Sequence, residues 1–262
     1  MISSFVAMSC LAPTNLALVF QDEFEVPGRP NPEKWNYEIG FIRNQEPQYY
    51  RPENAWVADG KLIIEGRREK VDNTDYESGS TDWRKNRKTA EFTSASVITR
   101  GKFSWQFGRL EVRAKIRPEV GLWPAIWTKG VEGIWPSCGE VDVMEFYRQQ
   151  LHANTAYGDS QKQVWDSAKT PIKHFFDLDP AWSLKFHVWT MDWSPDSIRL
   201  AVDGELLNET KITDIKNPNG TRPFHQPHWL LLNLAIGATG GDTSQTEFPT
   251  RFEVDYVRIY AD

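Results

Sequence analysis

The sequence predicts an all-β fold, and three observations support this prediction. Segments rich in β-branched and aromatic residues recur along the whole chain. No segment has the apolar spacing of a long amphipathic helix. Many strands joined by short turns favour an antiparallel sandwich or barrel. Turn-forming pairs separate several of the segments, at Asp59-Gly60, Pro195-Asp196 and Asp203-Gly204.

The expected strands follow one another along the chain with one long interruption. Within the segment 95–116, apolar and polar residues alternate on both sides of Gly108, as expected of a strand with one buried face. The polar stretch 69–91 is expected to be a loop inserted between strands. Its basic run "RKNRK" is expected to face solvent, or else to contact a substrate at the rim of a cleft. The strands are expected at 17–24, 61–69, 95–116, 140–147, 185–194, 197–207, 228–237 and 252–260.

No linker divides the chain, so we expect one domain over residues 17–262, preceded by an arm or leader remnant over residues 1–16. Cys10 lies in "AMSC", which loosely resembles a lipoprotein cleavage site, although an ordinary N-terminal arm fits equally well. No apolar run is long enough to span a membrane. We therefore expect a secreted or cell-surface protein, and a monomer.

The composition narrows the class of function. Hydrophobic residues make up 40% and charged residues 25%, as in ordinary soluble proteins. The 12 Trp and 14 Phe residues call for a large core, an aromatic-lined cleft that binds sugar faces, or both. The formal charge of −6 disfavours a nucleic-acid partner. Two cysteines and five histidines without metal-ligand spacing make a zinc site improbable.

The segment "CGEVDVMEFY" places Glu140, Asp142 and Glu145 among apolar residues. In a regular strand Glu145 would point away from the other two acids. A β-bulge, with Val143 or Met144 as the extra residue, returns Glu145 to their face. The Cα atoms of Glu140 and Glu145 would then be roughly 13 Å apart at about 3.3 Å per residue. Their carboxyl groups can approach to about 5 to 6 Å, the separation found in a retaining glycosidase.

Three acids on one face repel one another, so at least one pKa should rise and that group can act as a general acid near neutral pH. Asp142 would then hydrogen-bond the nucleophile and hold a shared proton. A metal site is the main alternative, because three carboxylates suit Ca²⁺ or Mg²⁺. A solvated strand of acids is disfavoured by the apolar neighbours. The residues by themselves leave catalysis and metal binding open.

Motifs along most of the chain resemble glycoside hydrolase family 16. The segment "GEVDVMEF" resembles the active-site signature of that family in the bulged form of laminarinases. The resemblance covers about residues 17–260 and implies a β-jelly-roll sandwich of two antiparallel sheets, with the acids in a concave substrate cleft. The other motifs, in order, are "DEF", "KWNYEIG", "EPQYYRPENAWVADGKLIIEGRRE", "GKFSWQFGRLEVRAKI", "GLWPAIW", "FHVWTMDWSPDSIRLAVDG", "QPHWLLLNLAIG" and "VDYVRIY".

The resemblance implies roles for individual residues. It makes Glu140 the nucleophile, Asp142 the assisting acid and Glu145 the acid/base, with no cofactor for catalysis. It also implies a structural calcium on the convex face. Its ligands would be the backbone carbonyls of Glu23 and Gly60 together with Asp255, since such oxygens suit Ca²⁺.

Sugar contacts follow from the same resemblance. Asn44 matches an asparagine that contacts sugar on the donor side. Trp123, Trp127 and Trp135 fall where the family lines its cleft, with core packing as the alternative, most strongly for Trp127.

Two residues depart from the laminarinase pattern. Ser96 stands in "TSAS" where laminarinases carry an arginine, and Ala156 stands where they often carry a histidine. A serine is shorter than an arginine and has fewer donors, so we expect a roomier donor subsite that admits a substituted sugar unit. Pure linear β-1,3-glucan is then not expected to be the best substrate.

We therefore expect an endo-acting, retaining glycoside hydrolase that cleaves a β-linked polysaccharide. The substrate predicted first is β-1,3-glucan or mixed β-1,3-1,4-glucan. An endo-β-galactosidase on poly-N-acetyllactosamine chains or galactans is the alternative within enzymes. The alternative from another class is a non-catalytic lectin on the same fold, which would be expected to lack one of the three acids.

Overall fold

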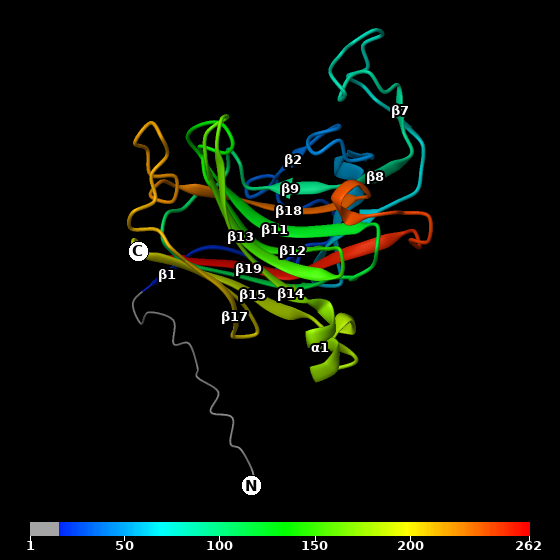
Figure 1. Cartoon of the computed structure of the whole chain (residues 1–262). Coiled ribbons are helices and arrows are strands. Elements are labelled where there is room, and N and C mark those ends of the chain that lie inside the picture. The colour runs from blue at the N-terminus through cyan, green and yellow to red at the C-terminus, as the bar shows by residue number, and fades with distance from the viewer. Residues whose placement is uncertain (1–15) are drawn as a thin grey trace.

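A computed structural model describes residues 16–262. Two large antiparallel sheets lie face to face and form most of the molecule (Figure 1). This arrangement confirms the prediction of an all-β sandwich. The first sheet contains, in spatial order, β17 (Glu205–Lys211), β16 (Ser197–Val202), β15 (His187–Trp193), β10 (Gly108–Lys115), β19 (Thr250–Ala261), β5 (Lys61–Gly66) and β4 (Ala55–Ala58), and β1 (Ala17–Asp22) pairs with β19.

The second sheet is strongly curved and carries the acidic strand (Figure 1). Its spatial order is β14 (Gln163–Pro171), β13 (Gln150–Gly158), β12 (Glu140–Tyr147), β11 (Leu122–Gly130), β18 (His228–Ile236), β9 (Ser96–Ile98) and β2 (Asn36–Glu38).

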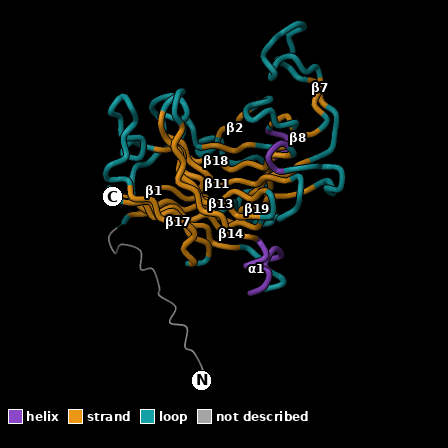
Figure 2. Tube along the Cα trace, in the orientation of Figure 1, coloured by secondary structure: helices purple, strands orange, loops and turns teal. Residues whose placement is uncertain are grey.

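Smaller elements surround the two sheets, and helix is scarce (Figure 2). The one α-helix of the described residues is α1 (Ile172–Leu178), which follows β14. No helix among residues 16–262 is long and apolar enough to cross a membrane. The remaining elements are the pair β3 (Gln48–Tyr50) and β8 (Phe92–Ser94), the pair β6 (Val71–Asp72) and β7 (Thr89–Ala90), and the 3-10 turns η1 (Pro52–Asn54), η2 (Trp182–Leu184) and η3 (Ala238–Gly240).

The core lies between the sheets because each strand there buries alternate residues. In β10 the side chains of Leu110, Val112 and Ala114 are fully buried and face the other sheet. In β12 the apolar residues Val141 and Phe146 join the same core. The opposite face of the curved sheet is thereby left to the acids and to the residues around them.

The prediction of one strand over residues 95–116 is wrong, because this segment forms two strands, β9 and β10, in different sheets. After β9 the chain turns, with Thr99 O accepting from the backbone amides of Lys102 and Phe103, and it re-enters as β10 in the facing sheet. The alternating aromatic residues of this turn pack against other rings instead of forming a strand face. Trp105 and Phe107, for example, both contact Trp193, with ring centroids 6.3 and 5.4 Å away.

The inserted loop projects from one end of the sandwich, beside the label of β7 in Figure 1. Within it Asn73 holds the loop closed, since its amide donates to the carbonyls of Arg84 and Arg87 at 2.8 Å each. The arm expected at 1–16, with Cys10, lies outside the described residues except for its last residue.

Candidate active site

A β-bulge lies in the acidic strand where the carboxylate spacing predicts it. Ile126 and Trp127, which are consecutive in β11, pair with Met144 and Asp142, so Val143 has no partner on that side. On the other side the register between β12 and β13 also shifts between Asp142 and Glu145. The extra residue reverses the alternation, so all three acids line the same cleft.

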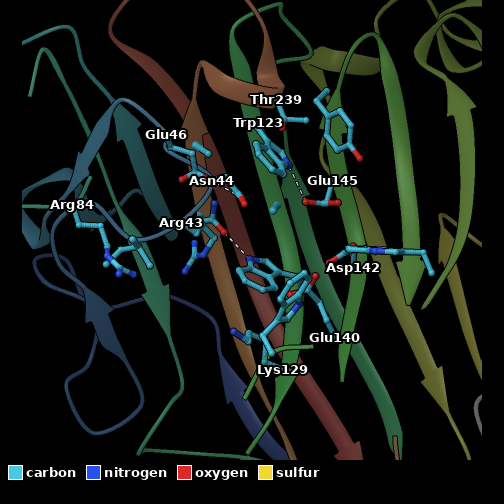
Figure 3. A pocket seen from close by; sticks show the side chains of 18 residues that line it. Arg43, Asn44, Glu46, Arg84, Trp123, Lys129, Glu140, Asp142, Glu145 and Thr239 are labelled. Atoms are coloured by element: carbon cyan, nitrogen blue, oxygen red, sulfur yellow. Dashed lines mark hydrogen bonds between the residues drawn. The ribbon is translucent and has the colours of Figure 1, made fainter. Parts of the chain in front are cut away.

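The cleft crosses the concave face of the curved sheet and has a volume of about 580 Å³. Figure 3 shows the acids projecting into it opposite the loop that follows β2. Its residues come from strands on both sides of β12 and from the loops at 42–46 and 69–91. Besides the acids they are Ile42, Arg43, Asn44, Glu46, Arg84, Trp123, Ala125, Trp127, Lys129, Trp135, Tyr147, Trp165, Asn233, Ala235 and Thr239.

Hydrogen bonds from β13 and β11 fix Asp142 and Glu145. Asn154, on β13, donates its amide N–H to Asp142 Oδ2 at 3.1 Å and to Glu145 Oε2 at 3.4 Å. Trp123, on β11, donates its indole N–H to Glu145 Oε1 at 2.8 Å (Figure 3). Both oxygens of Glu145 therefore have a donor, which holds the carboxyl group in one orientation.

The three acids titrate far above their ordinary range. Burial is the main cause for each, and it raises the pKa of Glu140 to about 8 and that of Glu145 to about 7. The charge of Asp142 raises the pKa of Glu140 further, and the charge of Glu140 does the same to Glu145. Asp142, which is buried beside Glu145, has a pKa well above its usual value. At neutral pH the cluster therefore keeps at least one proton.

The surroundings of the two glutamates differ in charge. Lys129 and Arg43 both lower the pKa of Glu140, and so does a hydrogen bond with Trp135. The charges that act on Glu145 come from carboxylates, which raise its pKa. Lys129 and Arg43 stabilise negative charge on Glu140, but burial leaves its pKa, about 8, above the value of about 7 for Glu145, so the assignment of Glu140 as the nucleophile rests on the family signature and not on these pKa values.

The aromatic residues predicted to bind sugar all line the cleft but differ in exposure. Trp123 and Trp135 are partly exposed. Trp127 is only 7% exposed, and its indole donates to Asn233 Oδ1 at 2.6 Å. The Arg43 guanidinium lies over the Trp127 ring, with its carbon 4.9 Å from the centroid. Trp127 is therefore a supporting residue beneath the cleft surface more than an open platform.

The other residues predicted to affect sugar binding, Asn44, Ser96 and Ala156, also differ in exposure. Asn44 is exposed in the cleft and donates to Glu46 Oε1 at 3.1 Å. Ser96 is fully buried and does not line the cleft, because its hydroxyl donates to Glu38 Oε2 at 2.6 Å. Ala156 is also fully buried, opposite Glu140 in the register of β12 and β13. The prediction of a roomier donor subsite at Ser96 is wrong, since Glu38 occupies the space in front of the Ser96 hydroxyl.

The residues expected to hold calcium converge in the backbone register. The pairing of β5 with β19 ends where Leu62 lies opposite Val254. The pairing of β1 with β19 ends where Asp22 lies opposite Val257. Glu23 and Gly60, which follow and precede these strand ends, therefore flank Asp255. The carboxylates are paired elsewhere, however, Glu23 with Arg258 and Asp255 with Arg113. No cluster of three or more acidic, His or Cys side chains among residues 16–262 could hold a metal ion.

Several cleft residues were not predicted from the sequence. Trp165 lies on the edge strand β14, is 45% exposed, and has its ring 6.4 Å from that of Trp135. β14 lies on the side of β12 away from β2, so Trp165 extends the cleft lining beyond the acidic strand. Arg43 comes from a loop whose sequence gives no periodic signal, whereas Arg84 belongs to the run "RKNRK", for which contact at the rim of a cleft was the alternative prediction. Only the excess of tryptophan hinted at additional aromatic cleft residues.

A β-sandwich with two glutamates brought together in an aromatic-lined concave cleft defines a glycoside hydrolase that cleaves polysaccharides. Comparison with known proteins then identifies the family. The sequence profile of glycosyl hydrolases family 16 matches residues 55–258 of the chain. The chain therefore belongs to that family.

Three relatives illustrate the similarity. The chain is 36% identical over 261 residues to a β-glucanase of Rhodothermus marinus, covering 93% of this chain and 84% of the relative. It is 31% identical to glucan endo-1,3-β-glucosidase A1 of Niallia circulans, covering 95% of this chain but only 38% of that protein. A structure from work on endo-acting O-glycanases, with which human gut bacteria initiate mucin breakdown, superposes with a TM-score of 0.86. It is 35% identical, and the match covers 95% of this chain and 92% of that one.

Proposed function

We propose that the protein is an endo-acting, retaining β-glucanase that cleaves β-1,3-glucan or mixed β-1,3-1,4-glucan. The observation that carries this proposal is the bulge that turns Glu145 into the cleft with Glu140. The cleft is open along the concave face, so a chain can lie across the sheet with units on both sides of β12. The glucanase names of two relatives support the sugar and linkage.

In the proposed mechanism Glu140 is the nucleophile. Its carboxylate oxygen attacks the anomeric carbon and forms a glycosyl-enzyme ester while the bond to the leaving oxygen breaks. Glu145 gives its proton to that oxygen. It then takes a proton from a water molecule that attacks the same carbon and releases Glu140. Asp142 assists through its contact with Asn154 and its charge, which affect the proton that the cluster retains.

A second candidate is an endo-β-galactosidase on poly-N-acetyllactosamine chains. A keratan-sulfate endo-1,4-β-galactosidase of Sphingobacterium multivorum, 28% identical over 261 residues, gives it weaker support than the glucanases give the first. A polysaccharide panel decides between the two candidates: laminarin, mixed-linkage glucan, agarose and poly-N-acetyllactosamine glycans, with kcat/KM and product sizes measured for each. The glucanase proposal predicts the highest kcat/KM on a glucan, with mixed-linkage glucan competing with linear β-1,3-glucan. A preference for the galactose-based chain would replace it.

Three further properties belong to the proposal. A bound calcium would be structural, since Asp255 lies in the sheet that does not carry the acids and Glu23 and Gly60 lie at the ends of its strands. Asp255 would have to exchange Arg113 for the ion. The protein is secreted or at the cell surface, because its polymeric substrate is too large to enter a cell, and it acts as a monomer. A lectin function is disfavoured by the presence of all three acids in one cleft.

A further inference from the structure

Ser96 is the start of a chain of contacts that ends in the cleft. It lies opposite Glu38 in the register of β9 and β2, and its hydroxyl donates to Glu38 Oε2. The same carboxylate oxygen accepts from Arg43 Nη2. Glu38 therefore joins a fully buried serine to a guanidinium that lines the cleft. An arginine at position 96 would displace this carboxylate.

The guanidinium of Arg43 is fixed on two sides. Glu38 holds its Nη2 atom, and the Trp127 ring supports its face, with a carbon-to-centroid distance of 4.9 Å. Trp127 is itself anchored to Asn233 at 2.6 Å. An arginine held by both a carboxylate and an aromatic ring loses little further entropy when it binds a ligand.

Donors of this guanidinium remain unused. Nη1 is buried and has no hydrogen-bond partner among the described residues. A buried donor without a partner is unfavourable, and such groups normally find water or a ligand. One-fifth of the side chain is exposed, and it lines the cleft on the same side of β12 as Asn44 (Figure 3). The guanidinium is therefore placed at the wall of the cleft, where a bound sugar would offer oxygen acceptors.

We propose that Arg43 is a specificity-determining residue of the donor side, where it donates to a neutral oxygen acceptor, a hydroxyl or an amide carbonyl, of a sugar unit next to Glu140. This inference rests on the proposed function of the cleft. The acceptor is neutral because Glu38 already balances the charge of Arg43, and Glu46 and the three acids of β12 surround the same space. A sulfate or carboxylate there would meet five carboxyl groups, and the cations Arg43, Lys129 and Arg84 do not outnumber them.

Arg43→Met tests the proposal, since methionine keeps an unbranched stem and removes every donor. We expect kcat/KM on the preferred polysaccharide to fall about 10- to 100-fold, the range for a hydrogen bond to a charged group. Arg43 lowers the pKa of Glu140, so its removal should raise that pKa and shift the acid limb of the pH profile to higher pH. Arg251→Met is the matched control: Arg251 also binds a glutamate and stacks on a tryptophan, but in the other sheet. Its kcat/KM should equal that of wild type.

A double-mutant cycle tests the role of Ser96 as a positioning residue. Ser96→Ala should lower kcat/KM several-fold in the wild type and have no effect in Arg43→Met, because the serine acts through Glu38 on Arg43. Equal effects in both backgrounds would overturn that role. The substrate on which Arg43→Met costs most, a glucan or an N-acetylated chain, identifies the acceptor as hydroxyl or amide.

Binding separates this inference from the proposed function. Affinity electrophoresis in gels that contain each polysaccharide compares Arg43→Met with wild type without turnover, and the variant should be retarded less. A wild type that binds but cleaves no polysaccharide would refute the proposed function and leave the binding comparison intact. An Arg43→Met variant that binds and cleaves as wild type does, or that loses no more than Arg251→Met, would refute the role of Arg43.

Discussion

The indole of Trp123 should set the pH at which the general acid loses its proton. Its N–H donates to Glu145 Oε1 at 2.8 Å and so stabilises the ionised carboxylate. Trp123→Phe removes that donor and keeps an aromatic ring against Tyr147, whose ring centroid is 5.3 Å away. A hydrogen bond to a charged group contributes about 1.5 to 3 kcal/mol. At about 1.4 kcal/mol per pKa unit, its loss should raise the pKa of Glu145 by about 1 to 2 units.

The assay is the pH dependence of kcat/KM. Glu145 must be protonated to donate, so activity falls as the pH rises through its pKa, which is about 7 in the wild type. The alkaline limb of Trp123→Phe should therefore move upward by about 1 to 2 pH units. Trp56→Phe, in the first sheet, is the control and should leave the limb in place. An unmoved limb, or one that moves down, would refute the assignment of Trp123 as a donor to the ionised acid.

Three more predictions concern the acids, a glycine and the metal. Glu145→Gln should lose much less kcat/KM, which reports formation of the glycosyl-enzyme, on substrates with activated leaving groups than on polysaccharide, whereas Glu140→Gln should lose activity on both; equal losses of kcat/KM in Glu145→Gln would count against its role. Gly139→Ala should lower the melting temperature and the activity, since Gly139 has φ +78° and a Cβ there would lie 2.8 Å from Pro223 Cβ. Gly204→Ala, at φ +84° with nothing within 4 Å, should lower only the melting temperature. Chelation should lower the melting temperature by mass action and spare activity in the cold, and immediate inactivation without a change in melting would place the metal in the cleft.

The spacing of the acids was sufficient to predict their arrangement. A strand has a strict period of two, so a third acid at an odd offset needs an extra residue to share the cleft, and the bulge leaves Val143 unpaired against β11. Trp123 and Trp135 could be placed by resemblance because they flank this strand in sequence. Periodicity is local, and these features depend on local geometry.

Features that depend on distant contacts could not be predicted in this way. The alternating aromatics before Gly108 have the pattern of a strand, yet they form a turn that fills the end of the sandwich, since Trp193 receives their rings. The edge strand β14 is mostly exposed and lacks an apolar period, so Trp165 was missed. The role of Ser96 depends on Glu38, in another strand, and on Arg43, in the loop that follows it. The comparison of serine with arginine at this one position predicted a roomier subsite, because it did not include these two partners.

Trapping the covalent intermediate tests the central claim most directly. A Glu145→Gln variant incubated briefly with an activated β-glycoside of the preferred sugar should form the glycosyl-enzyme faster than it breaks down, because water is no longer deprotonated. Mass spectrometry of the intact protein should show one added glycosyl unit, and digestion should place it on Glu140. An adduct on another residue, or none together with initial release of the α-anomer, would contradict a retaining mechanism with Glu140 as the nucleophile.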